Sequence, residues 1–376
     1  MAIASDLPLA RLYRQEFPIT GRFIYLNHAA VAPLCRPAAE AMQAWVSEAA
    51  EYGAFHYSDW LRCYEELRSA AARLIGAHRD EIAIVKNTSE GIATIASGLR
   101  IRPGDKMIAF QEEFPANWFP WKLCEQRGAR LEWLSVRDPL EKVDQAASGA
   151  RLLAISFVQY LDGYRADLNA LGEICRRRGC FFFVDAIQGL GAFPFDVNQA
   201  HIDALAADGH KWLLGPEGCG VLYVRKQRQE EVLPTEVGWT NFAHYADYAS
   251  RDLTWRADAG RYECGTLNTV GCYGLRAAIE FLLSIGISRI ASSIQALVAQ
   301  LADGVQQRGY ELLLPPSHNH GSGILAIRKP GVDSRMIVQT LREKNIITAP
   351  RQGWVRLSPH FYLQAEEIEQ VISALP

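Results

Sequence analysis

The sequence predicts an α/β protein: a mostly parallel sheet with helices on both faces, followed by a smaller α+β domain. Strand-like and helix-like patterns alternate as far as Gly271, which is typical of a parallel sheet. Two short apolar runs in this part each lead into a charged group, as buried parallel strands often do. After Gly271 the pattern changes to long helices and short strands. With 376 residues, 49% of them hydrophobic, the chain can bury the core of two domains.

The elements of the larger part follow from the spacing of apolar residues. Ala, Met and Trp recur at helical spacing after Pro37, which predicts the first helix. Short apolar runs bounded by polar or glycine-containing segments predict the strands. The expected elements, in chain order, are helices over 37–53 and 57–76, a strand over 82–85, a helix over 89–99, and strands over 107–110, 129–134, 152–157, 180–184 and 202–207.

The elements after Gly271 are predicted from a different pattern of apolar residues. Its expected elements are helices over 272–285 and 290–308, a strand over 323–327, a helix over 334–344 and a strand over 354–357.

Composition excludes several classes of function. A net charge of −3 gives no electrostatic footprint for nucleic acid or an anionic membrane. No stretch reaches 18 uninterrupted apolar residues, and the start of the chain lacks a signal-peptide pattern. The eight cysteines form no CxxC pair, and no His, Asp or Glu set has metal-ligand spacing. We therefore expect a cytoplasmic protein with reduced thiols and no bound metal.

An acid and a lysine follow two neighbouring predicted strands. Asp185 ends the run 180–184, and Lys211 follows the run 202–207. Ligands of open α/β sheets bind at the carboxyl ends of the strands. A lysine amine there can form a Schiff base with a carbonyl, while a carboxylate holds a protonated ring nitrogen. The alternative for Asp185 is a cap on the next helix. A dinucleotide loop at Gly189 is excluded because Pro194 occupies its third glycine position.

Two further features predict binding of anions. Thr88 and Ser89 begin the helix over 89–99, where hydroxyls and free backbone N–H groups suit a phosphate monoester. The alternative is an ordinary helix cap. Arg356 is a lone charge in the apolar strand over 354–357, where it needs an anionic partner. That partner is either a substrate carboxylate or an acid of the chain itself.

Together these residues carry a family resemblance. The chain resembles the class V aminotransferase and cysteine desulfurase superfamily, which consists of fold type I enzymes that use pyridoxal phosphate (PLP). The match runs from Tyr25-Leu26-Asn27-His28-Ala29-Ala30, through Ala207-Asp208-Gly209-His210-Lys211-Trp212, to Val355-Arg356-Leu357-Ser358-Pro359. The resemblance implies a large PLP-binding domain over 21–271. It also implies a small domain made of 1–20 and 272–376.

The resemblance also implies roles for particular residues. Lys211 is the catalytic lysine that binds PLP. The implied cofactor-binding residues are Thr88, Ser89, Phe114, Asp185, Gln188, His210, Gly265 and Thr266. The implied substrate-binding residues are Arg356, Asn27, His28 and Gln159, with Arg351 as a second carboxylate contact that favours a larger or dicarboxylic substrate. Gly265-Thr266 reaches the phosphate of a second subunit in relatives, so we expect a homodimer with shared active sites.

The chain departs from the desulfurase pattern at three positions. Phe114 aligns with a histidine that stacks on the cofactor ring; a phenyl ring stacks but carries no proton. Asp208 aligns with a serine, and because a carboxylate repels a phosphate we expect it to point elsewhere. The segment 348–354 aligns with the loop of the nucleophilic cysteine and contains no cysteine, which argues against a desulfurase.

We therefore expect an enzyme acting on a small amino acid, through an external aldimine and removal of the Cα proton by Lys211. The expected activity is that of a class V aminotransferase or a carbon–sulfur lyase. One alternative is an epimerase of the isopenicillin N epimerase type. Another is a catalytically silent protein of PLP-enzyme fold that serves as a binding or scaffold subunit.

Overall fold

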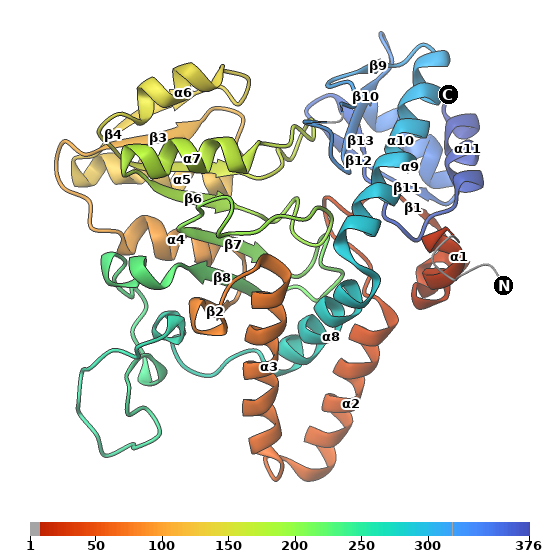
Figure 1. The fold of residues 1–376 in the computed structure, drawn as a ribbon. Coiled ribbons are helices and arrows are strands. Elements are labelled where there is room, and N and C mark those ends of the chain that lie inside the picture. The colour runs from red at the N-terminus through yellow and green to blue at the C-terminus, as the bar shows by residue number, and fades with distance from the viewer. Residues whose placement is uncertain (1–7, 318) are drawn as a thin grey trace.

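A seven-stranded sheet forms the centre of the computed structural model, which describes residues 8–317 and 319–376. Its order is β2-β8-β7-β6-β5-β3-β4 (Figure 1). The strands are β2 (Ile82–Val85), β3 (Lys106–Phe110), β4 (Arg130–Leu134), β5 (Ala150–Ser156), β6 (Phe181–Asp185), β7 (Ala204–Asp208) and β8 (Gly220–Val224). The strands from β7 to β4 are parallel to one another, whereas β8 runs antiparallel to both of its neighbours. The predicted mostly parallel sheet is confirmed.

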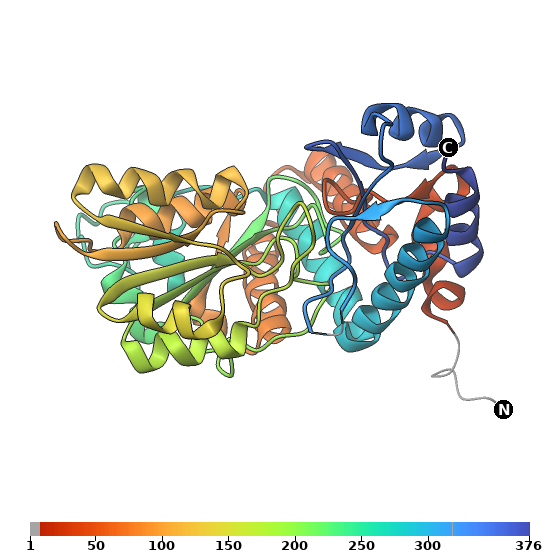
Figure 2. The same ribbon diagram turned by 90° about the horizontal axis from the view of Figure 1, so that it is seen from above.

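Helices cover both faces of this sheet, as the view from above shows (Figure 2). Phe181 and Phe183 of β6 join the core under α4 (Thr88–Gly98) and α5 (Phe119–Leu123). The residues that alternate with them, Phe182 and Val184, join the core under α6 (Leu140–Ala147) and α7 (Leu168–Arg178). Every residue of β6 is buried, which explains its uninterrupted apolar run.

The sequence did not predict β8. It returns beside β7 through a loop without a helix, and this loop carries Lys211. Because β8 returns antiparallel to β7, no crossover helix follows β7, and the loop between the two strands stays at the carboxyl end of β7. Lys211 can therefore lie beside the end of β6.

The remaining chain builds a second, antiparallel sheet in the order β12-β13-β10-β9. Its strands are β9 (Glu311–Leu312), β10 (Leu325–Arg328), β12 (Ala349–Arg351) and β13 (Trp354–Leu357). The helices of this part are α8 (Thr269–Ile285), α9 (Ile287–Gln307), α10 (Ser334–Glu343) and α11 (Ala365–Ala374). The predicted helices and strands after Gly271 are confirmed to within a few residues.

The N-terminal segment packs against this second part. The strand β1 (Ile24–Tyr25) pairs in parallel with β11 (Ile346–Ile347), and Arg14 near α1 (Leu9–Tyr13) forms a 2.6 Å ion pair with Glu367. Residues 1–7 of the predicted small domain lie outside the described residues, and the division into domains at residues 20 and 271 stays a prediction.

Two long helices, α2 (Arg36–Tyr52) and α3 (Tyr57–Ile75), project away from the sheet beside α8 (Figure 1). In the described part of the chain, no single helix has the length and apolar character needed to cross a bilayer. Only α8 and α9 taken together meet that criterion, and they are bent by 82°.

Candidate active site

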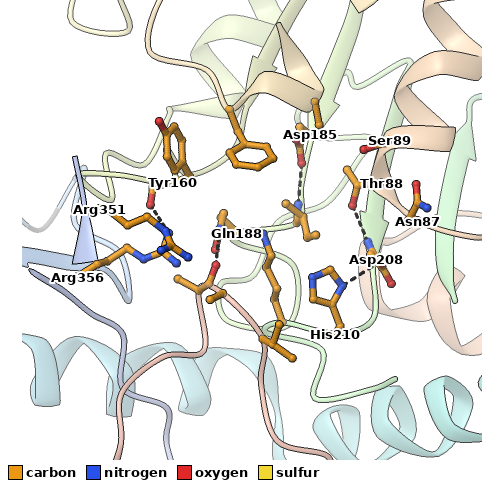
Figure 3. A pocket seen from close by; sticks show the side chains of 17 residues that line it. Asn87, Thr88, Ser89, Tyr160, Asp185, Gln188, Asp208, His210, Arg351 and Arg356 are labelled. Carbon is orange, nitrogen blue, oxygen red and sulfur yellow. Dashed lines mark hydrogen bonds and ion pairs between the residues drawn. The ribbon is translucent and has the colours of Figure 1, made fainter. Parts of the chain in front are cut away.

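A central cavity of about 340 Å³ opens at the carboxyl ends of β6 and β7 (Figure 3). Segments far apart in the sequence meet there: the turn after β1, the N-terminus of α4, the loop after β7 and the β12–β13 hairpin. The residues predicted from the sequence that line it are Thr88, Ser89, Phe114, Asp185, Gln188, His210, Lys211, Arg351 and Arg356.

Asp185 and Lys211 provide opposite charges in the wall of the cavity, with Asp185 buried and Lys211 partly buried. The side chain of Asp185 is only 3% exposed, and burial raises the pKa of its carboxyl group to about 6. Burial lowers the pKa of Lys211 to about 8, against the opposing effect of Asp185 and with help from Arg356. One Asp185 oxygen accepts a hydrogen bond from the Ile187 backbone N–H at 3.1 Å, so this acid also caps a turn. A lysine of pKa near 8 can act as a base near neutral pH.

The N-terminus of α4 presents hydroxyl groups to the same cavity. Asn87 caps the helix, because its side-chain oxygen accepts from the Glu90 backbone N–H at 2.9 Å. The alternative of a Ser or Thr cap is therefore wrong, since Thr88 and Ser89 are already within the first turn. The Thr88 hydroxyl accepts a hydrogen bond from the Asp208 backbone N–H at 2.9 Å and keeps its own proton free to donate. This end of the cavity can bind an anion.

Asp208 lies in the cavity wall, and the expectation that its carboxylate points away from a bound phosphate stays a prediction. Its carboxylate accepts a 2.6 Å hydrogen bond from the Gly209 backbone N–H and lies 3.0 Å from His210 Nδ1. The hydrogen bond from Gly209 holds the side chain at the end of β7, beside His210 (Figure 3).

Gln188 is fixed by two hydrogen bonds in the cavity wall. Its amide nitrogen donates to the Ala29 carbonyl at 2.9 Å, and its oxygen accepts from the Trp212 indole N–H at 3.0 Å. One amide hydrogen of Gln188 remains available to a bound molecule.

Phe114 lies on the more open side of the cavity, with 47% of its surface exposed. The Lys211 amine lies 5.9 Å from the centre of its ring, and the Tyr160 ring meets it edge to face at 5.2 Å. The phenyl face is therefore available to stack on a flat ring near Lys211.

Arg356 has no acidic partner among the residues that the structure describes. It is 2% exposed, its Nη1 donates to the Tyr160 carbonyl at 2.7 Å, and its Nε has no hydrogen-bond partner. Within the described residues no carboxylate forms an ion pair with it, so the alternative of an internal ion pair is wrong. Burial and, as a smaller effect, the charge of Arg351 lower the pKa of Arg356 to about 9. An anion that entered the cavity would satisfy this buried cation.

The structure does not bring five predicted residues into the cavity wall: Asn27, His28, Gln159, Gly265 and Thr266. His28 is fully buried, with its two ring nitrogens bonded to the Ser358 carbonyl and the Tyr362 hydroxyl, both at 2.7 Å. The Gln159 amide instead donates to Glu113 at 2.9 Å. Existing polar partners thus hold these two side chains behind the wall.

Gly265 and Thr266 lie beside Lys86 and Glu90, in the wall of a separate hollow at the outer surface. Their predicted role requires a second subunit, which a single chain does not contain.

Sequence reasoning missed Tyr160, which links the larger sheet to the β12–β13 hairpin. Its carbonyl accepts from Arg356, and its hydroxyl accepts a 2.7 Å hydrogen bond from the Gln352 amide. The position of Tyr160 shortly after β5 was the one available signal, because loops at the carboxyl ends of parallel strands line ligand sites.

Comparison with known proteins places this chain in a family. The sequence profile described as "Aminotransferase class-V" matches residues 24–371. An uncharacterized aminotransferase of Bacillus subtilis, YcbU, is 29% identical over 98% of this chain and 97% of its own. The structure of a cysteine desulfurase from Thermococcus onnurineus superposes with a TM-score of 0.88, at 27% identity over 99% of this chain and 97% of the other. A mutant of the protein C-DES with glycine covalently linked to its PLP cofactor superposes with a TM-score of 0.89, at 23% identity over 96% and 98%.

Proposed function

The chain belongs to the class V aminotransferase family of PLP-dependent enzymes with the type I fold, and from this premise we propose that it is an aminotransferase or carbon–sulfur lyase for a small amino acid. One observation carries the proposal: a partly buried lysine of lowered pKa shares a single cavity with the buried Asp185 and with Arg356, which has no acidic partner among the described residues. Acid, base and carboxylate-binding groups are the set that removal of a proton next to a carboxylate requires.

The residues of the cavity fit the cofactor. Thr88, Ser89 and the free N–H groups of α4 would hold its phosphate, and Asp185 would hold its ring nitrogen. Lys211 would bind its carbonyl carbon, and Phe114 offers a ring face for stacking. When bound, PLP supplies an electron-accepting ring that stabilises negative charge at the substrate Cα.

The residues of the chain itself then have distinct tasks. Arg356 binds the substrate α-carboxylate and fixes the position of Cα relative to Lys211. The neutral Lys211 amine takes the Cα proton onto Nζ. Asp185 keeps a proton on the ring nitrogen by offering a buried negative charge to it.

The positions of the thiols favour this reading over a desulfurase. No cysteine is among the described residues that line the central cavity. Cys264, the exposed one, lines the separate surface hollow with Lys86, and the tight turn between β12 and β13 consists of Gln352 and Gly353. Persulfide formation requires a thiolate within reach of the substrate sulfur.

The test is the visible absorption of the holoenzyme on addition of single L-amino acids. A lasting change that a 2-oxo acid reverses supports transamination; a transient change with accumulation of ammonia and a 2-oxo acid supports the lyase. We expect Lys211→Ala to abolish both reactions and the control Lys142→Ala, at an exposed lysine of α6, to retain them. Undiminished turnover in Lys211→Ala would overturn the proposal.

Two alternatives have their own outcomes in this experiment. Exchange of the Cα hydrogen with solvent, with inversion and without a 2-oxo acid, would favour the epimerase. A purified protein that takes up no PLP would favour the silent binding subunit.

We also propose that the enzyme works as a homodimer. The support is that Gly265 and Thr266 lie outside the wall of the central cavity, in a hollow that they share with Tyr57 and Leu61, exposed apolar residues of α3. A second copy on this surface would cover those side chains and bring Gly265-Thr266 to its partner.

A further inference from the structure

Two arginines extend into the central cavity from the same face of the β12–β13 hairpin. The antiparallel register pairs Ala349 with Arg356 and Arg351 with Trp354. Directly paired residues share a face of the sheet, and so do alternate residues of one strand. Arg351 and Arg356 are therefore diagonal neighbours on one face, with the small Ala349 opposite Arg356. Figure 3 shows both side chains on the same side of the cavity, next to Tyr160.

Neither arginine has an acid to neutralise it. Arg351 donates to the Pro350 carbonyl at 2.9 Å, and Arg356 donates to the Tyr160 carbonyl and keeps its Nε without a partner. Among the described residues no carboxylate lies within ion-pair distance of either guanidinium. The two charges also oppose each other, since Arg351 contributes to the lowered pKa of Arg356.

The acids of the cavity lie at its other end. Asp185 faces Lys211, and Asp208 is held by the Gly209 N–H at the end of β7, beside His210 (Figure 3). The hairpin end of the cavity therefore carries two positive charges and no negative one among its described residues. A substrate with a single carboxylate would leave one of these charges unneutralised.

We infer that the substrate is a dicarboxylic amino acid whose two carboxylates bind Arg356 and Arg351 at the hairpin end of the cavity. Arg356 takes the α-carboxylate because it is more buried than Arg351 and has a larger electrostatic effect on the Lys211 amine than Arg351 has. Arg351 takes the side-chain carboxylate. The inference rests on the proposed function, since it specifies the substrate class of the same site.

A guanidinium distinguishes a carboxylate from the matching amide. The guanidinium donates two parallel N–H bonds to the two oxygens of a carboxylate. An amide has only one oxygen, and its NH₂ group would face one of the guanidinium donors. Discrimination by a site built for one polar group is large, because the wrong group leaves buried donors unpaired. We therefore expect Arg351 to select a diacid over its own monoamide.

The experiment measures binding of glutarate and its monoamide to the holoenzyme by titration calorimetry. These molecules carry no amine, so binding is measured without reaction. We expect glutarate to bind at least about 10-fold more tightly, and Arg351→Gln to bring the ratio close to one. Arg351→Lys keeps the charge without the paired donors, and we expect an intermediate ratio. The matched control is Arg335→Gln at an exposed position of α10, which should keep the wild-type ratio.

Reaction with substrates separates this inference from the proposed function. We expect KM for aspartate or glutamate to be at least about 10-fold below that for asparagine or glutamine, and this difference to disappear in Arg351→Gln. Equal binding of diacid and monoamide to the wild type, or a ratio unchanged by Arg351→Gln, would overturn the inference. If amides react as readily as diacids, the inference alone fails. If no amino acid changes the absorption of the cofactor, the proposed function fails as well.

Discussion

Lys211 lies among two carboxylates, Asp185 and Asp208, and two guanidinium groups, and the balance of these charges influences its pKa. Burial is the largest influence on its pKa, and it disfavours the ammonium form. Asp185 opposes this effect, whereas Arg356 and Arg351 add to it. The resulting pKa of about 8 leaves a substantial fraction of neutral amine at neutral pH.

This balance predicts how the lysine titrates in the apoprotein. The pH dependence of acetylation of Lys211, followed by peptide mass spectrometry, should give a midpoint near 8. Arg356→Gln removes a positive neighbour and should raise the midpoint, whereas Asp185→Asn removes the negative one and should lower it. Lys86, whose pKa is raised by Glu90 and Glu236, is the internal control and should titrate above its usual 10.5. A midpoint above 10 for Lys211 would contradict this account.

At the scale of elements, a buried carboxylate ties the Phe114 turn to the sheet. Glu113 accepts hydrogen bonds from the Ser156 backbone N–H at 2.7 Å, from Asn117 at 2.9 Å and from Gln159 at 2.9 Å, and also from the Ser156 hydroxyl. These donors come from the end of β5, from the turn after Phe114 and from the loop that carries Tyr160. One side chain thus fixes the position of two residues of the cavity wall, Phe114 and Tyr160.

Glu113→Gln should therefore loosen this wall. The amide would turn an N–H group toward donors that now share a carboxylate, which we expect to cost about 1–3 kcal/mol of unfolding free energy. The measurement is urea denaturation, with Glu141→Gln on the exposed face of α6 as the control.

The pH dependence of this contribution has a defined sign. Burial raises the pKa of Glu113 from 4.5 to about 7. A pKa raised in the folded state means that the contribution of this group to stability is complete below pH 4.5 and declines as the pH rises through 7. The stability of the wild type relative to Glu113→Gln should accordingly decrease as the pH rises from 4.5 through 7. A gap that stays constant from pH 4 to 8 would contradict this assignment.

The elements show what the sequence could and could not predict. The strand that ends at Asp185 and the helix that starts at Thr88 were predictable, since local apolar patterns mark both. The strand β8 was not predicted, because its antiparallel pairing with β7 depends on a loop that reverses the direction of the chain. The same limit explains His28 and Gln159: residue types near a site do not reveal that Ser358, Tyr362 and Glu113 already occupy their polar atoms.

At the scale of the whole molecule, two segments carry many of the exposed apolar side chains. Several belong to α2, α3 and the turn between them, and others to the segment before α8. They are Val46, Tyr52, Phe55, Tyr57 and Leu61, together with Trp239, Tyr248 and Leu253. Phe55, at the tip of the helical pair, is 81% exposed. An apolar surface of this kind is typical of a protein interface.

The proposed homodimer predicts that light scattering after gel filtration gives twice the 41.9 kDa chain mass. The double substitution Phe55→Asp and Leu253→Asp should shift the protein toward the monomer, because buried charge at an interface is unfavourable. Since Gly265-Thr266 would then lose its partner, the same variant should bind PLP more weakly in an equilibrium dialysis. The control is Met336→Asp, which adds a charge at another exposed apolar residue, on α10. The shared site would be refuted if the wild type were a monomer and the interface variant bound PLP as tightly as the wild type. One chain would then supply every contact to the cofactor.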